Sequence, residues 1–370
     1  MDATEGPTGR HSPLHAEHRA LDASFGEFSG WLMPLQYPAW VLAEHASVRE
    51  RVGVFDVSHL GTIRVTGAGS AEFLNLCFTN DLERIGAGHA QYTLACDDDG
   101  GVIDDLIVYR VADDDLLCVP NAANTATIAE RLAARAPAAV RVDNTHGQCA
   151  IIAVQGPRSR ELLASVGLSS PERYLDFVSA GTDPFVDVMV CRSGYTGELG
   201  FELILPAAPA PELWNDLLTA GAELGCVPCG LGARDTLRTE MGYPLHGHEL
   251  STEITPVEAG LNWAVGWKKS AFWGREALLA QRSGGPEWVS RGLVLPRGSV
   301  PRPGMGVFDG ASPVGRVTSG TFSPTLRTPI ALARIRSAAA ETETLSVEAR
   351  GRLLPATVTA PPFVVTSGLR

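Results

Sequence analysis

The sequence predicts an α+β protein that ends in a separate, β-rich domain. Over the first 280 residues, strand-like and helix-like segments are mixed without regular alternation, which favours an α+β fold over a doubly wound sheet. A polar Gly/Pro linker, "QRSGGPEW", follows at 281–288. Beyond it, Pro and Gly are frequent and the strands are short, which is typical of a small antiparallel β-barrel or sandwich. We therefore expect a domain boundary near residue 284.

The elements of the α+β region follow from hydrophobic periodicity. Alternating and β-branched runs predict strands at 61–67, 105–111, 116–121, 149–156, 185–194 and 200–206. Amphipathic segments predict helices at 125–136, 159–167, 211–225 and 270–282. Residues 1–12 have no apolar signal core and no Arg-rich amphipathic pattern, so we expect a disordered leader there.

Composition narrows the class of protein and its partners. The chain has 370 residues, 45% of them hydrophobic and 19% charged, enough for a large core in two or three domains. Its net charge of −12 argues against nucleic acid and anionic membrane as partners, because both require a basic surface. Its seven scattered cysteines indicate free thiols in a reducing compartment, so we expect a cytoplasmic protein.

Two adjacent acids interrupt an apolar strand in "DDDGGVIDDLIVYRV", residues 97–111. The Asp/Gly-rich segment predicts a hairpin turn, and side chains alternate faces along the strand that follows. Asp105 therefore shares a face with Tyr109, whereas Asp104 shares the other face with Arg110, which disfavours a paired-carboxylate mechanism. Asp104 is expected to bind local amides or Arg110. Asp105 is either structural or placed for a cationic or amine-bearing ligand.

Two further segments contain charged candidates. In "SGYTGELGFELILP" (193–206), Glu202 points away from its apolar neighbours, so it either faces solvent or accepts two N–H donors from a heterocycle. In "CGLGARDTLRTEMG" (229–242), Arg234 lies where a helix opens and is either an internal salt-bridge residue or an anion clamp. The "GLG" there lacks the third glycine of a dinucleotide fingerprint and does not predict NAD binding.

Metal binding is not predicted. "PLHGHEL" (244–250) contains the pair His246 and His248, but no third His or Cys lies at a convincing spacing. "CVPC" (226–229) has no second pair for a zinc ribbon, and ordinary packing is favoured over a redox role.

Taken together, these stretches resemble the aminomethyltransferase (T-protein) family of the glycine cleavage system. Any one segment would be a weak signal, but the ordered set is highly specific. The matching segments are "FSGWLMPLQY" (28–37), "GVFDVSHLG" (53–61), "TND" (79–81), "GGVIDDLIVY" (100–109), "NAAN" (121–124), "AVQGP" (153–157), "GYTGELGFE" (194–202), "PCGLGARDTLR" (228–238) and "TSGTFSPTL" (318–326).

The resemblance implies a fold and a reaction. The fold is a three-domain cloverleaf around a folate cavity, with two α+β domains interleaved along 13–283 and an antiparallel β-barrel over 284–370. The reaction transfers a one-carbon unit from the aminomethyl-lipoyl arm of the H-protein to tetrahydrofolate, releasing ammonia. The resemblance also implies a monomer.

The resemblance also implies roles for individual residues. Asp105 matches the acid that stabilises the cationic iminium formed during transfer, and no Ser or Cys nucleophile is required. Glu202 matches the carboxylate that binds the pterin, and two arginines match residues that bind the anionic glutamate tail. The implied folate-binding residues are Tyr92, Tyr109, Asn121, Tyr195, Glu202, Arg234 and Arg370.

Two alternatives on the same scaffold differ in function. One is another tetrahydrofolate-dependent demethylase that acts on a small methyl donor, and the other is a non-catalytic folate-binding assembly factor. The unmodified "GGVIDD" and "GYTGE" segments favour aminomethyl transfer. The chain departs from the family at Leu60, where Met is common, at "HGHE" in place of "YGQE", and at Arg327, where Gly is usual.

Overall fold

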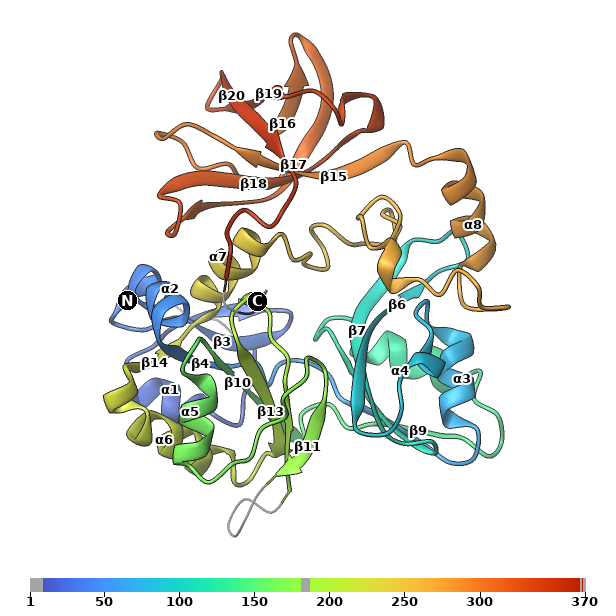
Figure 1. Ribbon diagram of the computed structural model, residues 1–370, viewed down its shortest axis with the longest axis vertical. Coiled ribbons are helices and arrows are strands. Elements are labelled where there is room, and N and C mark those ends of the chain that lie inside the picture. Colours follow the sequence, from blue (N-terminus) through green and yellow to red (C-terminus); the bar gives the residue numbers. More distant parts are fainter. Residues whose placement is uncertain (1–8, 181–186, 367, 369–370) are drawn as a thin grey trace, which may run out of the picture.

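The computed structural model describes residues 9–180, 187–366 and 368, which form three lobes arranged as a cloverleaf (Figure 1). Of the predicted disordered leader, residues 1–8 lie outside the described residues. Arg10 and His11 instead form β1 (Arg10–His11), which pairs with Trp31 and Leu32. Ser12 is buried, so residues 10–12 belong to the folded protein.

The first lobe is built on two sheets. In the larger sheet the strands run in the order β11, β12, β13, β10, β4, β14, and in the smaller sheet β1, β3, β2. The strands after β1 are β2 (Ser24–Phe28), β3 (Trp31–Gln36), β4 (Val52–Asp56), β10 (Cys149–Gln155), β11 (Phe177–Ala180), β12 (Val188–Cys191), β13 (Gly200–Pro206) and β14 (Cys226–Cys229). The helices are α1 (His15–Ala20), α2 (Trp40–Glu50), α5 (Ser159–Ser165), α6 (Ala210–Ala220), η2 (Ala222–Leu224) and α7 (Leu231–Met241).

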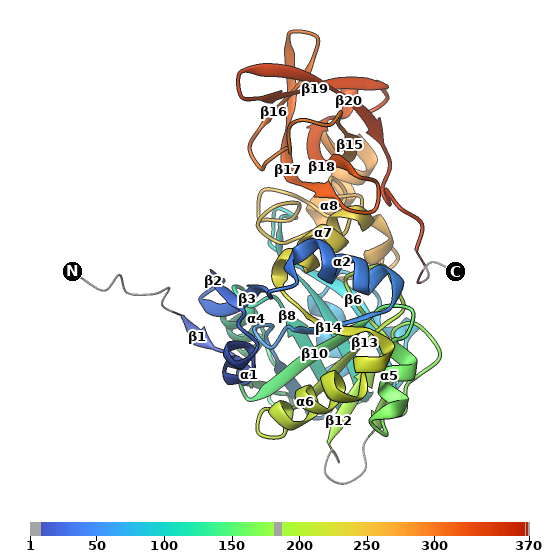
Figure 2. The same ribbon diagram turned by 90° about the vertical axis from the view of Figure 1, so that its left-hand side faces the viewer.

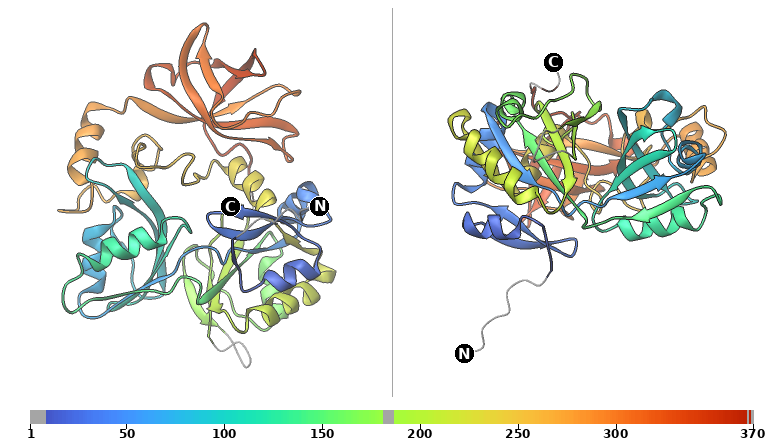
Figure 3. Two further views of the ribbon diagram at one scale, coloured as in Figure 1. Left: turned by 180° about the vertical axis from the view of Figure 1, so that it is seen from behind. Right: turned by 90° about the horizontal axis from the view of Figure 1, so that it is seen from below.

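The second lobe is an antiparallel sheet in the order β6, β7, β8, β5, β9, covered by helices (Figure 3). Its strands are β5 (Ile63–Thr66), β6 (His89–Cys96), β7 (Val102–Ala112), β8 (Asp115–Pro120) and β9 (Arg141–Asn144). Its helices are α3 (Ser70–Cys77), η1 (Leu82–Arg84), α4 (Thr125–Ala133), η3 (Asn262–Ala264) and α8 (Arg275–Gly284). The predicted hairpin is confirmed, since β6 and β7 pair across the turn at 97–101.

The third lobe is a closed antiparallel barrel in the order β15, β18, β17, β16, β19, β20. Its elements are β15 (Trp288–Val294), β16 (Gly306–Asp309), β17 (Ser312–Ser323), β18 (Thr328–Arg336), η4 (Ser337–Ala339), β19 (Thr344–Ala349) and β20 (Arg352–Thr359). The predicted β-barrel is therefore confirmed. The linker expected from residue 281 begins later, because α8 continues to Gly284 with Leu278 buried.

The two α+β lobes are interleaved in the chain, as the resemblance implied. The chain leaves the first lobe after β4, forms β5 to β9 in the second, and returns at β10. After α7 it crosses again to α8 and then enters the barrel, which lies above both lobes (Figure 2). None of the helices in the described part of the chain is long and apolar enough to cross a membrane.

One face of the large sheet packs within the first lobe, and the other faces the second lobe. The internal face contacts α5 and α6 through residues such as Ile152, Phe201 and Trp214. The opposite face forms a shared core in which Ile151 of β10 lies in the same apolar cluster as Tyr109 of β7. This shared core joins the two lobes directly beside the two acids of β7.

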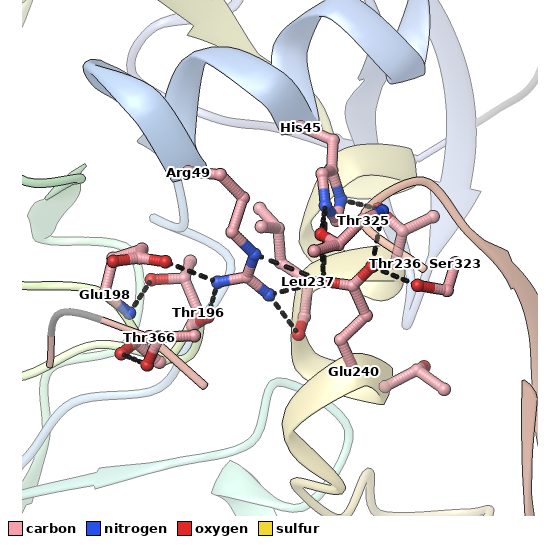
Figure 4. Close-up of polar contacts among 12 residues, drawn as sticks. His45, Arg49, Thr196, Glu198, Thr236, Leu237, Glu240, Ser323, Thr325 and Thr366 are labelled. Atoms are coloured by element: carbon pink, nitrogen blue, oxygen red, sulfur yellow. Dashed lines mark hydrogen bonds and ion pairs between the residues drawn. The ribbon is translucent and has the colours of Figure 1, made fainter. Parts of the chain in front are cut away.

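A buried polar cluster joins α2, α7, the barrel and the turn at 194–198 (Figure 4). Glu240 at its centre accepts hydrogen bonds from Ser323 and Thr325, and it pairs with Arg49 at 2.8 Å and His45 at 3.3 Å. Arg49 also pairs with Glu198 at 3.1 Å. The cluster fixes α7, which contains Arg234, against the third lobe.

Candidate active site

The first acid of the β7 pair, Asp104, is fully buried and is held by amide groups. Its Oδ2 accepts the backbone N–H of Asn121 at 3.0 Å, and its Oδ1 accepts side-chain N–H groups of Asn121 at 2.9 Å and Asn124 at 2.6 Å. Asp104 binds amides as expected, but the prediction that these are local was wrong, because Asn121 and Asn124 lie 17 and 20 residues further along the chain. The alternative partner, Arg110, instead pairs with Asp113 at 2.8 Å.

The second acid, Asp105, is half-buried on the opposite face of β7. Its Oδ2 accepts the hydroxyl of Tyr92 at 3.0 Å, and its Oδ1 accepts the side-chain amide of Asn121 at 2.8 Å. The predicted separation of the acids by strand face is right. The two carboxylates are nevertheless linked, because the Asn121 amide at the end of β8 donates to both.

Burial governs the ionisation of both acids. Burial raises the pKa of Asp105, while the Tyr92 hydroxyl, the nearby His246 and the Asn121 amide oppose that rise. Burial and the charge of Asp105 raise the pKa of Asp104. The N–H groups of Asn124 and Asn121 that donate to Asp104 favour its ionised form and oppose that rise.

Aromatic rings lie next to Asp105. The ring of Tyr92 stacks on Trp263 with 5.3 Å between centroids, and Trp263 is 62% exposed. An exposed indole stacked on the tyrosine that binds the carboxylate gives a flat apolar surface on which a planar ligand ring can lie.

A second charged group is formed by Glu202 and Arg234. Glu202 is 7% exposed, so the alternative that it faces solvent is wrong, and it accepts the Ser193 hydroxyl at 2.5 Å. The Arg234 guanidinium lies 4.7 Å from the ring centroid of Tyr195. Burial lowers the pKa of Arg234, and the charge of Glu202 opposes this, so the two side chains interact electrostatically. Arg234 Nη1 is buried and has no hydrogen-bond partner among the described residues.

The other predicted site residues differ in their surroundings. Tyr109 is 1% exposed and packs edge-on against Phe177 in the shared core, with 5.6 Å between centroids. Tyr195 donates its hydroxyl to the carbonyl of Pro244 and stacks on Tyr243. Arg370 lies outside the described residues.

The two histidines of "HGHE" point to different lobes. His246 contacts Asn124 and the carbonyl of Val102 in the second lobe, whereas His248 contacts the carbonyl of Thr318 in the barrel. Within the described part of the chain, no group of three or more His, Cys, Asp and Glu side chains is arranged to hold a metal ion.

Sequence reasoning missed Asn124 and Trp263 as neighbours of the acids. The signal for Asn124 was present in "NAAN", because residues three apart lie on one side of a helical turn. Trp263 had no such signal, since it reaches Tyr92 from a segment 171 residues away in the chain.

Two protein families match the chain. The family described as "GCVT N-terminal domain" matches residues 14–269, and "Glycine cleavage T-protein C-terminal barrel domain" matches residues 290–364. The cloverleaf and these matches define a protein of the T-protein class.

Curated and solved relatives make the assignment specific. The chain is 55% identical to an aminomethyltransferase of Parafrankia sp. (strain EAN1pec) over 97% of this chain and 98% of that one. It is 52% identical to an aminomethyltransferase of Mycobacterium tuberculosis (strain ATCC 25618 / H37Rv), covering 96% of each. The crystal structure of glycine cleavage system aminomethyltransferase T from Bartonella henselae superposes with a TM-score of 0.91 at 34% identity, covering 96% of this chain and 98% of that one. The chain therefore belongs to the aminomethyltransferase family of the glycine cleavage system, as its motifs predicted.

Proposed function

We propose that this enzyme transfers the one-carbon unit of aminomethyl-lipoyl H-protein to tetrahydrofolate. The products are 5,10-methylenetetrahydrofolate, ammonia and dihydrolipoyl H-protein. The observation that carries this proposal is a half-buried carboxylate, Asp105, held between an amide and the hydroxyl of a tyrosine whose ring stacks on an exposed indole. The family match supplies the reaction class.

Asp105 is proposed to act on developing positive charge. N5 of the folate attacks the aminomethyl carbon as ammonia leaves, and the carbon–sulfur bond then breaks to release the dihydrolipoyl thiolate. This leaves a cationic N5 iminium, which a nearby carboxylate stabilises until N10 attacks its carbon to close 5,10-methylenetetrahydrofolate. Burial raises the pKa of the Asp105 carboxyl, and an approaching cation favours its ionised form. Tyr92 and Asn121 hold the carboxylate in place, so little reorganisation is needed during transfer.

The remaining polar residues suit the parts of tetrahydrofolate. Glu202 is proposed to accept the pterin N–H and amino groups. Arg234, which has an unpartnered Nη1 among the described residues, is proposed to bind the anionic glutamate tail, with Arg370 as a second arginine. Tyr92, Tyr195 and Asn121 would contact the ligand between these ends, and the buried ring of Tyr109 would support that wall.

Cell compartment and assembly are also proposals. All seven cysteines are free, which suits a reducing compartment, so we propose a cytoplasmic enzyme. We propose that it works as a monomer with lipoylated H-protein as its macromolecular partner.

Ammonia release from aminomethylated H-protein, measured with and without tetrahydrofolate, tests the reaction. We expect strong stimulation by folate, and release that is independent of folate would contradict the proposal. A small methylated amine offered in place of H-protein is expected not to be turned over, which separates this reaction from that of a free-substrate demethylase.

The role of Asp105 is tested by Asp105→Asn. We expect kcat to fall by roughly 10²-fold, the scale of losing one preorganised electrostatic group, with folate affinity changed only modestly. The matched control is Asp98→Asn in the exposed turn of the same hairpin, which should retain full activity. Normal turnover in Asp105→Asn would remove Asp105 from the reaction.

A further inference from the structure

The loop 243–250 crosses the centre of the molecule and contacts all three lobes. In the first lobe, the carbonyl of Pro244 accepts the Tyr195 hydroxyl. In the second lobe, His246 contacts Asn124, and in the barrel His248 contacts the carbonyl of Thr318 at 2.9 Å. The two histidines are two positions apart, yet only His246 faces the acids of β7.

The partners of His246 determine which ring nitrogen bears the proton. Its Nε2 lies 3.3 Å from the carbonyl oxygen of Val102, and a carbonyl can only accept, so Nε2–H is the donor. In the neutral ring, Nδ1 is then an acceptor. It lies 3.1 Å from the side-chain nitrogen of Asn124, which donates to it.

Asn124 connects His246 to the acids through its side-chain amide. Its amide nitrogen has two hydrogens, one directed to His246 Nδ1 and the other to Asp104 Oδ1 at 2.6 Å. If the amide were turned over, its oxygen would face the lone pairs of both acceptors. Asp104 in turn fixes Asn121 through two hydrogen bonds, and Asn121 donates to Asp105 at 2.8 Å.

We propose that His246 is a positioning residue for the transfer reaction, acting through Asn124, Asp104 and Asn121 to orient the carboxylate of Asp105. Its unprotonated Nδ1 is the last acceptor of a hydrogen-bonded chain. In that chain Asn124 donates to Nδ1 and to Asp104, and Asn121 donates to Asp104 and Asp105. This proposal deepens the proposed function and depends on it.

Two substitutions separate the two nitrogens of the ring. The oxygen of an Asn side chain reaches the position of Nδ1, so His246→Asn keeps the acceptor for Asn124. The nitrogen of a Gln side chain reaches the position of Nε2, so His246→Gln keeps the donor to Val102 but removes the acceptor. We expect His246→Gln to lower kcat about tenfold, the scale of losing one hydrogen bond in the transition state, and His246→Asn to retain most of it.

Folate affinity and melting temperature distinguish positioning from a structural role. In His246→Gln the folate Kd and the Tm should stay near those of the parent, because the loop keeps its contact with Val102. His248→Gln, in the same loop but facing the barrel, is the matched control and should keep its kcat. The proposal is overturned if His246→Gln retains full kcat, if His246→Asn loses as much kcat as His246→Gln, or if the loss follows Tm or Kd.

Asp105→Asn measured in the same assay separates this proposal from the proposed function. If Asp105→Asn loses turnover while His246→Gln does not, only the role of His246 is wrong. If Asp105→Asn retains turnover, the assignment of the site itself is wrong.

Discussion

At the scale of single residues, Asp104 and Asp105 show how one position along a strand changes the chemistry of the same side chain. Asp104 faces three N–H donors in the core of the second lobe, so its role is structural. Asp105 is half-buried and accepts the hydroxyl of Tyr92, whose ring stacks on the exposed Trp263, so it can respond to a ligand. Because side chains alternate between the two faces of a strand, adjacent acids on β7 lie in different surroundings and have different roles.

Asp104→Asn should destabilise the fold. An Asn side chain offers one oxygen and one NH2 group where Asp104 offers two acceptors, so one buried N–H of Asn121 or Asn124 would face another donor. We expect the free energy of unfolding to fall by about 1–3 kcal/mol, the cost of an unsatisfied buried polar group. Urea denaturation checks this, and Asp98→Asn in the exposed turn should show no such loss.

The acid limb of the pH–rate profile should report Asp105. Its pKa is raised above the ordinary value of 3.8, so the carboxylate becomes protonated, and loses its effect on the cation, at a higher pH than an exposed Asp would. We therefore expect kcat to fall as the pH decreases through a value above 3.8. In Asp105→Asn this limb should be absent from the residual activity. If Asp105→Asn kept the same acid limb, the limb would report the ionisation of another group.

At the scale of elements, α7 connects the barrel to the site through Glu240. Burial alone would raise the pKa of Glu240, but the hydrogen bond and charge of His45, the charge of Arg49 and the Ser323 hydroxyl lower it to about 2. Because this pKa lies below the ordinary 4.5, the stabilisation is complete above pH 4.5 and is lost as the pH falls towards 2.

Glu240→Gln should remove this contribution. It leaves the buried Arg49 and His45 without their carboxylate, and breaking a buried pair in this way costs about 3 kcal/mol. We expect lower stability at pH 7 and a smaller loss of stability between pH 4.5 and 2 than in the parent. Glu161→Gln, which breaks the exposed Arg158–Glu161 pair, is the control and should change neither.

Arg327 is a second test at this scale. The resemblance to the family led us to expect Gly at this position, and the φ of +55° lies in the left-handed region that disfavours residues with a Cβ. Arg327→Gly should therefore raise the free energy of unfolding by up to about 1 kcal/mol without altering turnover. The matched change Arg297→Gly would remove the guanidinium that donates to the Arg327 carbonyl, and should not stabilise the protein.

Features that depend on residues close together in the chain could be predicted from the sequence, and features that depend on distant segments could not. Alternation along β7 placed Asp104 and Asp105 correctly, because it is a property of one strand. It did not reveal that Asn121, from the next strand, bridges them. Burial of Glu202 likewise depends on a long-range contact, because Glu202 shares a face of β13 with Ile204 of the shared core, and no local pattern encodes that contact.

At the scale of the whole molecule, the hydrophobic periodicity of the sequence could not predict that the two lobes are interleaved. That expectation came from the family resemblance alone. Its physical consequence is the shared core, where β4, β10 and α7 of the first lobe pack against β6, β7 and β8 of the second. The chain also passes between the two lobes repeatedly, so unfolding one lobe exposes apolar surface on the other. We therefore expect the two lobes to unfold as one cooperative unit.

Hydrogen exchange with core substitutions tests this cooperativity. Ile152 lies on the side of β10 away from the second lobe, and Ile128 of α4 lies in the core of the second lobe away from the first. Ile152→Ala should cost about 2–5 kcal/mol, and we expect the most protected amides of β8 to lose as much protection as those of β10. Ile128→Ala should lower protection in β10 in the same way. A loss confined to the substituted lobe in both variants would show that the shared core does not couple them, and that the lobes hold the site residues as independent units.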